Sequence, residues 1–474
     1  MASAEKRGKT WRVKWKNGDG EWVWEPGFAT KQDALDWGRD QEAKVRAGTW
    51  IDPKAGEMTL AEWCDEWYDA QDLDITTMVN YEYAIRLLIK PYLGGKTLNE
   101  LTPLLHDKWQ KQLRRKHKDS TANTAHTRLH TILEDAVLNK KIGSNPAMKK
   151  GRRRGKLQEA VEAAESLWTT PVVVLRIAER AAIWTGREDE FIAVVLKAFT
   201  GMRWGELLAL DVDHCLFRKV QIFWQLKEVK GAFLRDLPKG KRRREATLPP
   251  FLGDLLARQI ERARKRTCLC QGEQPRWHKD LDNPLPVCEG GRQYLFLGPK
   301  LGHFRRSNFG RDIWRPVVDG EHPATGGKAA RPARPVVHDG TRWHALCEGL
   351  TPHDLRHSQE TWLGEEQVAQ KAINRRMGHK TKRMESIETI YTHVSDEMER
   401  QICDALERRL WAAVGELAAE RPTDGPASPV AVLDELIAVW RARQAAAGTR
   451  DEDHVPAVSP NDERPLPKIS GKGL

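Results

Sequence analysis

The chain has 474 residues, which is too long for a single hydrophobic core and predicts two to four domains. Its 78 lysines and arginines outnumber its 67 acidic residues, and this net charge of +11 favours a polyanionic partner, nucleic acid before ribosomes or an anionic membrane surface. The N-terminal sequence MASAEKRGKTWRVKW lacks the apolar core of a signal peptide, no apolar run reaches transmembrane length, and seven cysteines, an odd number, argue against a disulfide framework. We therefore expect a cytoplasmic, DNA-associated protein without a membrane partner.

The N-terminal end of the chain predicts a small α+β module. Trp11, Val13 and Trp15 alternate along a strand, NGDG supplies a turn, and EWVW forms the second strand of a hairpin. Thr30 is placed to cap a helix over residues 31–48. The aromatic side chains on one hairpin face could contact DNA or pack on the helix, and packing is the favoured interpretation.

The next segment, residues 57–148, has the periodicity of a compact all-helical unit. Thr59 and Glu62 form a capping box at the start of its first helix. Pro91 predicts the end of the second helix, because proline cannot continue the hydrogen-bonding pattern. The four expected helices cover residues 60–71, 76–90, 103–116 and 121–141.

A basic segment, NKKIGSNPAMKKGRRRGK, follows at residues 139–156 and contains no acidic residue. A solvated linker is the simplest interpretation of such a charge block. A linker that lies along DNA phosphates explains better why all the charges have one sign, because each neutralised phosphate releases counterions. On this second interpretation the DNA-binding residues are Lys149, Lys150, Arg152, Arg153 and Arg154.

The remainder of the chain predicts a mixed, mainly helical domain over residues 160–413. Short strands are expected at residues 220–224 and 293–298. The final segment, residues 414–474, contains one expected helix at 429–447 and ends in a tail rich in proline, glycine and charge, which predicts disorder.

Two segments of this domain combine basic residues with helix or strand signals. In TGMRWGELLALD, Arg203 lies near the start of an apolar helix and Glu206 follows three residues later on the same face, a pattern that alone favours an ordinary ion pair. In LRDLPKGKRRREATLP, residues 234–249, two short strands flank a turn that bears lysines. Alone, that segment is typical of a basic hairpin or a nuclear-localisation-like patch.

The segment LTPHDLRH predicts the start of another helix. Thr351 can cap it and Pro352 suits its first position. His353 and Arg356 then lie three residues apart on one face, next to backbone N–H groups, which is a suitable arrangement for binding phosphate.

The segments MGHK and IYTHV supply a further histidine and tyrosine. His379 lies at a turn, and Tyr391 precedes a helix whose Val394, Met398 and Ile402 have the spacing of core residues. A single tyrosine of this kind is more often structural than catalytic.

The order and spacing of these motifs resemble those of the tyrosine recombinase (phage integrase) family. The matching segments are TGMRWGELLAL, PKGK…ATLP, TPHDLRH, MGHK and IYTHV, and the variant RRMGHK…IETIYTHVSDEM is most similar to integrases of actinobacterial phages and integrative plasmids. The resemblance implies a multidomain fold with an α+β arm-site-binding module, an all-α SAM-like core-binding domain, a basic linker, a mixed mainly-α catalytic domain of the DNA breaking-rejoining type, and a C-terminal helix with a tail. The corresponding residues are 1–56, 57–148, 149–159, 160–413 and 414–474.

The resemblance also implies a catalytic role for each motif. Arg203 and Arg356 match the clamp on the scissile phosphate, for which the planar guanidinium fork is suited. Tyr391 matches the nucleophile that forms a 3′-phosphotyrosine, and His353 matches the residue that accepts and returns its proton.

Three further residues match supporting positions of the family. Lys239 matches the general acid for the leaving 5′ oxygen, with Lys241 as the alternative because such a turn can shift by two residues. His379 matches the residue that hydrogen-bonds the phosphate and steadies Tyr391, and Glu206 would support the clamp from behind. The phosphotyrosine preserves the bond energy and the arginines replace a metal, so no cofactor is implied.

The implied function is site-specific recombination that integrates or excises a mobile element. Its partners would be double-stranded attachment sites and three further copies of the chain in a tetramer on DNA, while an excisionase and a host DNA-bending protein remain open. Two alternatives share the motifs: a type IB topoisomerase or dimer-resolving recombinase with the same chemistry, and a non-catalytic DNA-binding regulator. The N-terminal module favours an integrase over the first, and the pairing of Lys239 with Tyr391 argues against the second.

Two stretches are longer than in many relatives. The longer spacing from His379 to Tyr391 leaves the position of the tyrosine open. The long segment before LTPHDLRH contains candidate zinc ligands, although its C-x-C spacing differs from the usual C-x-x-C and reduced cysteines in a surface insertion are the favoured interpretation. These candidates are Cys268, Cys270, His278 and Cys288.

Overall fold

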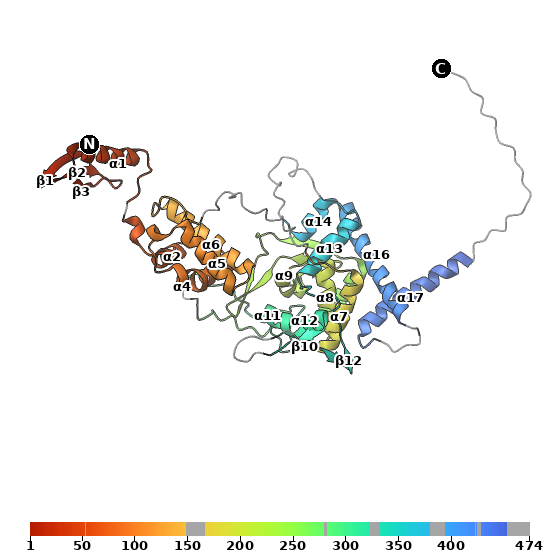
Figure 1. The fold of residues 1–474 in the computed structure, drawn as a ribbon. Coiled ribbons are helices and arrows are strands. Elements are labelled where there is room, and N and C mark those ends of the chain that lie inside the picture. The colour runs from red at the N-terminus through yellow and green to blue at the C-terminus, as the bar shows by residue number, and fades with distance from the viewer. Residues whose placement is uncertain are drawn as a thin grey trace, which may run out of the picture. The chain divides into compact units, whose positions relative to one another are not determined.

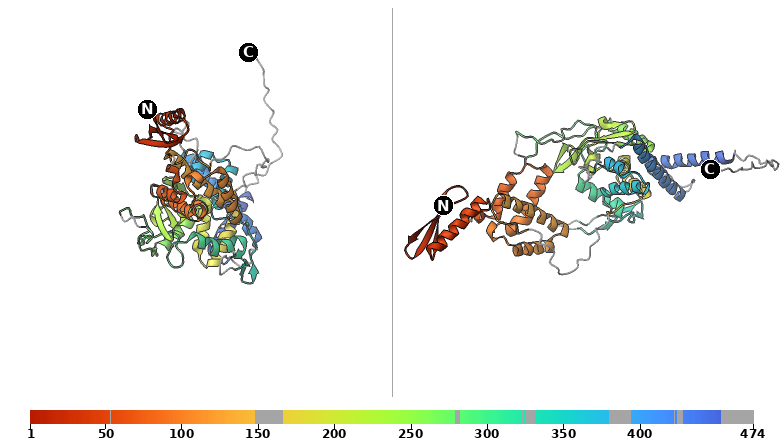
Figure 2. Two further views of the ribbon diagram at one scale, coloured as in Figure 1. Left: turned by 60° about the vertical axis from the view of Figure 1, so that its left-hand side comes forward. Right: turned by 90° about the horizontal axis from the view of Figure 1, so that it is seen from above.

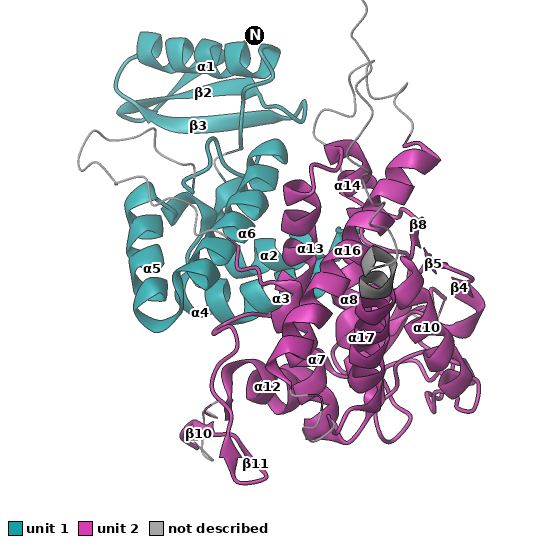
Figure 3. Ribbon diagram, turned by 90° about the vertical axis from the view of Figure 1, so that its right-hand side faces the viewer, with its two compact units in different colours: residues 1–161 teal, residues 162–474 magenta. Residues whose placement is uncertain are grey.

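The computed structural model divides the chain into two compact units, residues 1–161 and 162–474 (Figure 3). It describes residues 1–52, 54–147, 166–278, 282–322, 324, 331–379, 394–421, 423 and 428–452, with residues 447–452 described by their backbone alone. Within these residues, every helix is too short or too polar to cross a lipid bilayer.

The first part of unit 1 is a three-stranded antiparallel sheet with one helix across one face (Figures 1 and 2). Val13 and Trp15 point from the middle strand toward the helix and are buried with Ala34. The Trp15 ring also meets the Trp37 ring edge-on, at 5.6 Å between centroids. The predicted hairpin, helix and core packing are confirmed, whereas the first strand of the sheet was not predicted. The elements are β1 (Ser3–Arg7), β2 (Thr10–Lys16), β3 (Trp22–Phe28) and α1 (Lys31–Arg46).

Other aromatic side chains of the sheet remain at the surface. Trp22 and Trp24 are 49% and 41% exposed. The Arg12 guanidinium stacks 3.9 Å from the Trp24 ring centroid, and the Lys14 ammonium lies 5.3 Å from that of Trp22. This solvent face therefore combines cationic and aromatic groups, the side-chain types that contact nucleic acid.

The second part of unit 1 is helical and has its own hydrophobic core. The capping box of Thr59 and Glu62 is confirmed, with the Thr59 hydroxyl accepting from Glu62 N and the carboxylate accepting from Thr59 N. The helices are α2 (Leu60–Asp69), α3 (Ile75–Tyr83), α4 (Lys90–Leu93), α5 (Pro103–Lys116) and α6 (Asp119–Leu138), with a π-helical segment η2 (Ala84–Ile89) and 3-10 turns η1 (Ala55–Glu57) and η3 (Leu98–Glu100).

The predicted end of the second helix at Pro91 is wrong. The chain continues from α3 through η2 into α4, in which Pro91 is the second residue. First-turn residues of a helix donate no intrahelical hydrogen bond, and the change of register in a π-helical turn creates such a position in mid-helix. Proline is tolerated there because the N–H that it lacks has no partner to lose.

Unit 2 is built around α8 (Glu188–Thr200), which is almost entirely buried. Helices α7, α10 and α13 pack against α8, and α16 packs against α7 and α13 (Figure 3). Phe191, Phe199 and Trp362 are among the largest fully buried side chains of this core. The helices of unit 2 besides α8 are α7 (Pro171–Thr185), α9 (Trp204–Leu208), η4 (Val212–His214), α10 (Pro250–Ala263), α11 (Arg306–Asn308), η5 (Phe309–Trp314), α12 (Arg315–Asp319), α13 (Asp354–Glu365), α14 (Gln370–Met377), α16 (Asp396–Glu420) and α17 (Ala431–Glu452).

The strands of unit 2 form small antiparallel sheets. The strand expected at residues 220–224 is present as β5, whereas residues 293–298 make only a single bridge, between Tyr294 and Asp211. The strands are β4 (Cys215–Leu216), β5 (Lys219–Ile222), β6 (Gln225–Val229), β7 (Ala232–Asp236), β8 (Arg244–Thr247), β9 (Glu321–His322), β10 (Arg334–Pro335), β11 (Val337–His338) and β12 (Thr341–Arg342).

The two strands that flank the lysine-bearing turn do not pair with each other. Strand β7 pairs with β6, and β8 joins the sheet β4-β5-β8. The turn therefore connects two separate sheets rather than closing a hairpin.

The C-terminal helices complete the described part of unit 2. Helix α16 runs across residue 413 to Glu420, and α17 packs against it. Ile402 is buried in the core, with Val394 and Met398 packed against it, as their spacing predicted. The predicted linker residues 149–159 and the end of the predicted tail lie outside the described residues, and the domain boundaries stay predictions.

Candidate active site

A buried carboxylate at the start of α9 holds two arginines. Arg203 is the N-cap residue of α9, its backbone N–H donates to Glu206 Oε2 at 2.8 Å, and its Nη1 donates to Oε1 at 3.0 Å. Arg244 of β8 donates to both oxygens of the same carboxylate, at 2.9 and 2.7 Å. The predicted pairing of Arg203 with Glu206 is therefore present. Sequence reasoning missed Arg244.

The ionisation of Glu206 is fixed by this contact. Burial alone would raise the pKa of Glu206, but the hydrogen bonds and charge of Arg244, and then Arg203, lower it to about 2. The side chain is fully shielded from solvent. Glu206 is thus a permanent anion that orients both guanidinium groups.

Arg356 lies where the ends of three helices meet. Its guanidinium donates to the carbonyl of Gly201, at the C-terminus of α8, at 2.6 Å, and to that of Met377, the last residue of α14. Arg356 itself belongs to the first turn of α13 and is 2% exposed. Gly201 has φ +66°, and this left-handed turn ends α8. Helix C-termini carry partial negative charge, which favours a guanidinium at this position.

Positive charge accumulates around Arg356. Burial first, and then the charges of Arg203 and Arg244, lower the pKa of Arg356 to about 9. Lys197 of α8 is 2% exposed and donates to the Met202 carbonyl at 2.7 Å. Its pKa falls to about 7 because of burial and the charge of Arg356.

Lys197 was also missed by sequence reasoning. A signal existed, because this lysine stands inside the apolar helical run FIAVVLKAFT, where burial is expected. The corresponding signal for Arg244 is its period-two spacing with buried Ala246 in β8.

His353 lies beside this cluster, at the N-cap of α13. The pKa of His353 is lowered to about 4, by desolvation first and then by Lys197, His357 and Arg356. The predicted capping by Thr351 is wrong, since α13 begins at Asp354, whose carboxylate accepts from the Thr351 N–H at 2.7 Å. The His353 imidazole is therefore neutral at neutral pH and can accept a proton.

His379 follows the left-handed Gly378 that ends α14. Its Nδ1 lies 3.7 Å from Glu360 Oε1. The pKa of His379 is lowered by burial first, and then by Arg356 among other charges. The described residues thus bring Arg203, Arg356, His353 and His379 into one electrostatic neighbourhood.

Other predicted residues are not joined to this neighbourhood. Lys239 and Lys241 are exposed in the turn after β7, where Lys241 N donates to Pro238 O at 2.8 Å and Lys241 has φ +54°. No contact within the described part of the chain links either lysine to the arginines. Tyr391 lies outside the described residues, as does the predicted DNA-binding set Lys149, Lys150, Arg152, Arg153 and Arg154.

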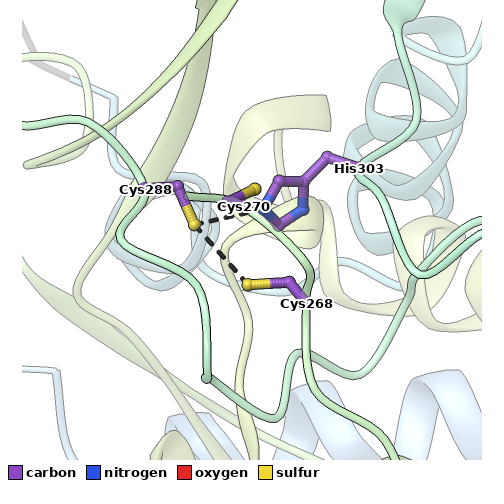
Figure 4. A group of neighbouring side chains, drawn as sticks. All are labelled: Cys268, Cys270, Cys288 and His303. Atoms are coloured by element: carbon purple, nitrogen blue, oxygen red, sulfur yellow. Dashed lines mark hydrogen bonds between the residues drawn. The ribbon is translucent and has the colours of Figure 1, made fainter. Parts of the chain in front are cut away.

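The predicted zinc candidates separate into three that cluster and one that does not. Cys268, Cys270 and Cys288 lie together, and the fourth group at the cluster is His303 (Figure 4). His278 instead has its Nε2 2.9 Å from the Asn283 carbonyl oxygen. The prediction of His278 is therefore corrected to His303, because the chain returns to the cysteines at residues that no sequence spacing indicated.

The chemistry available at the arginine cluster is the binding of an anion. Arg203 and Arg244 share one fully buried carboxylate, and the buried Arg356 and Lys197 add further positive charge beside them. The pKa values of two nearby imidazoles, His353 and His379, are lowered, which favours their neutral forms. A group with a single negative charge and several acceptor oxygens, such as a phosphodiester, would relieve the repulsion that lowers the pKa of Arg356.

We expect Glu206→Gln to lower the free energy of unfolding by about 3–5 kcal/mol, because the variant leaves the buried guanidinium of Arg244 and the partly buried one of Arg203 without their counterion. Since the folded-state pKa of Glu206 lies below its ordinary value of 4.5, its stabilisation is complete above pH 4.5 and is lost as the pH falls toward 2. Urea unfolding of wild type and variant should therefore differ most at neutral pH and converge in acid.

The matched control is Glu245→Gln, one residue along the same strand as Arg244. Glu245 is 41% exposed and pairs with Lys219 at 3.0 Å, so its loss should cost less than about 1 kcal/mol. Equal effects of the two substitutions would show that Glu206 is not a buried structural anion.

Two protein-family models match the chain, one in each unit. Residues 59–114 match the phage integrase N-terminal SAM-like domain, and residues 336–398 match the phage integrase family. The integrase of Mycobacterium phage L5 is 23% identical over 393 residues, which is 80% of this chain and 89% of that protein.

Solved integrase structures are similar at lower identity. The Tn1549 transposon integrase in complex with a circular intermediate DNA is 19% identical, with a TM-score of 0.49 over 74% of this chain and 99% of the other. A lambda integrase dimer bound to a COC′ core site is 15% identical, with a TM-score of 0.41 over 83% and 96% of the two chains.

The family matches cover the helical part of unit 1 from α2 into α5, and the segment of unit 2 that contains His353, Arg356, His379 and Tyr391. They agree with a multidomain fold that joins a SAM-like domain to a mainly helical catalytic domain. Residues 59–114 and 336–398 are therefore phage integrase family domains, and the chain combines the SAM-like and catalytic parts of a tyrosine recombinase, a DNA strand transferase.

Proposed function

We propose that this chain is a site-specific recombinase that integrates or excises a mobile element at attachment sites through a 3′-phosphotyrosyl intermediate. The observation that carries the proposal is the position of Arg356. Its guanidinium is buried between two helix ends, beside Arg203, with a surplus of positive charge that a scissile phosphate would neutralise. The relative from Mycobacterium phage L5, described as an integrase, supports this activity.

The first chemical step uses four roles around the phosphate. Arg203 and Arg356 bind the non-bridging oxygens and stabilise the negative charge of the pentacovalent transition state. The Tyr391 hydroxyl attacks phosphorus and gives its proton to neutral His353, whose lowered pKa keeps it ready to accept. The P–O bond to the 5′ oxygen breaks, and Lys239 protonates that oxygen as it leaves.

The second step reverses the first on another strand. A free 5′-hydroxyl attacks the phosphotyrosine, the new phosphodiester forms, and Tyr391 recovers its proton. One ester is exchanged for another at each step, so neither ATP nor a cofactor is consumed. His379 would hydrogen-bond the phosphate and hold Tyr391 in line.

We infer double-stranded attachment sites and a homo-tetramer on DNA as the partners. The basic run of residues 149–154 would track phosphates between the two DNA-binding domains. The N-terminal sheet would bind separate arm sites, and its exposed Trp22, Trp24, Arg12 and Lys14 suit this contact.

The test is recombination between two plasmids that carry DNA taken from either side of the gene. We expect the purified chain to produce recombinant junctions whose sequence defines the attachment site. Relaxation of supercoils without recombinants would favour a topoisomerase instead, and sequence-specific binding without cleavage would favour a regulator.

A further inference from the structure

Three thiols and an imidazole of unit 2 point at one common centre (Figure 4). One ligand atom from each of Cys268, Cys270, Cys288 and His303 lies within 4.8 Å of all the others. Cys268, Cys288 and His303 are 2%, 4% and 8% exposed, and Cys270 is half-buried. The cluster lies in the insertion between α10 and α11. None of its four residues has a role in the proposed reaction.

Two distances within the cluster are close to those of a tetrahedral metal site. The Cys268 and Cys288 sulfurs are 3.7 Å apart, and Cys288 Sγ is 3.3 Å from His303 Nε2. Around a tetrahedral Zn²⁺ ion with ordinary bond lengths, two sulfurs lie about 3.8 Å apart and a sulfur and a nitrogen about 3.6 Å apart. These two distances therefore differ from the zinc geometry by about 0.1 and 0.3 Å, and the remaining pairs lie within 4.8 Å.

The backbone around the cysteines is shaped for this arrangement. Cys288 is followed by Gly290 and Gly291 with φ +82° and +68°, and a Cβ added to Gly290 would overlap the Cys270 carbonyl oxygen. Two backbone hydrogen bonds connect this turn to the turn that contains Cys268 and Cys270. Gly291 N donates to Cys268 O, and Cys268 N donates to Arg292 O, both at 3.0 Å. The glycines thus let two cysteine-bearing turns approach closely enough to share a ligand.

The imidazole is held in place by aromatic neighbours. The His303 ring packs edge-on against Phe233 and Tyr294, at 5.0 and 4.8 Å between centroids. These contacts aim Nε2 at the cysteine sulfurs. A disulfide between Cys268 and Cys288 would leave Cys270 and His303 facing it without function, whereas a metal ion uses all four groups.

We propose that Cys268, Cys270, Cys288 and His303 bind one structural Zn²⁺ ion. Three thiolates and an imidazole in a buried tetrahedral set are the ligands that zinc prefers. The thiols release their protons on binding, which leaves one net negative charge on the site. All four positions are filled by the protein, so no position remains for water or substrate and the ion has no catalytic function.

The ion would anchor the strand that leads to Lys239. Cys288 N donates to Phe233 O in β7 at 2.8 Å, Arg235 N donates to Pro286 O at 2.7 Å, and Leu234 bridges Val287. Zinc would therefore fasten β7 to the insertion. Any effect on DNA cleavage rests on the proposed function, whereas zinc binding itself does not.

The primary experiment measures the metal content of the full-length protein, purified under reducing conditions from zinc-supplemented cells. We expect about one zinc ion per chain in wild type and loss of most of it in Cys288→Ser and His303→Ala. Cobalt substitution should give the thiolate charge-transfer and tetrahedral ligand-field bands of a three-sulfur site.

Two control variants and one rescue variant make the outcome decisive. His278→Ala and Cys403→Ser, whose side chains lie outside the cluster, should keep the ion, and His303→Cys should retain it with four thiolates. Metal-free wild type without cobalt thiolate bands, or equal loss of zinc in His278→Ala and His303→Ala, would each overturn the proposal.

Discussion

We expect Tyr391→Phe to bind attachment-site DNA with an affinity close to that of wild type and to form no covalent protein–DNA adduct. The substitution removes only the phenolic oxygen, which is the atom that becomes esterified to phosphorus, and leaves the ring and every basic residue in place. The measurement is denaturing electrophoresis after incubation with a nicked suicide substrate, which traps the intermediate because the released 5′ fragment diffuses away.

The matched control for the nucleophile is Tyr83→Phe. Tyr83 is 48% exposed and belongs to unit 1, so its adduct yield should equal that of wild type. Adduct formation by Tyr391→Phe at the wild-type level would assign the nucleophile to another residue and would overturn the proposed mechanism.

We expect Arg356→Lys to slow cleavage by about a hundredfold or more while DNA binding changes little. Lysine keeps the positive charge but cannot hold the carbonyls of Gly201 and Met377 and at the same time present a planar fork to phosphate. Single-turnover cleavage of a suicide substrate measures the rate, and a mobility-shift titration measures binding separately. Arg203→Lys should also slow cleavage, because a lysine cannot reproduce the planar guanidinium that Glu206 orients in the wild-type protein.

Arg375→Ala provides the comparison for the clamp variants. Arg375 is on α14, two residues before the Met377 carbonyl that Arg356 binds, but its side chain is 59% exposed. Among the described residues it lies 3.9 Å from Glu399 and donates to the Val394 carbonyl at 3.3 Å. We expect its cleavage rate to stay within a few-fold of wild type. If Arg356→Lys also stayed within that range, Arg356 would have no place in the clamp.

Local sequence signals predicted much of the fold because they depend on neighbouring residues. The capping box of Thr59 and Glu62 and the bounds of α5 follow from short-range hydrogen bonding and periodicity, and both are observed. Two local predictions were wrong. The predicted cap of α13 by Thr351 was wrong because the Asp354 carboxylate accepts from the Thr351 N–H instead, and the predicted helix end at Pro91 was wrong because a π-helical turn precedes it.

The environment of the candidate site was harder to predict, because it depends on contacts between distant segments. Glu206 pairs with Arg244 across 38 residues, and nothing in the run KRRR indicates which arginine turns inward except the alternation of β8. His303 joins Cys268 only after the chain has passed through an entire insertion. The motif residues themselves could be identified, because their order along the chain carries the family resemblance.

The mutual repulsion among Arg203, Arg244 and Arg356 has a consequence for the protein without DNA. Each anion that enters the site lowers the electrostatic free energy of the folded state, so occupancy and folding are thermodynamically linked. Sulfate or inorganic phosphate should therefore raise the melting temperature of the wild-type protein more than chloride does at equal ionic strength. The DNA substrate would thus stabilise the folded protein as the counterion of this cluster.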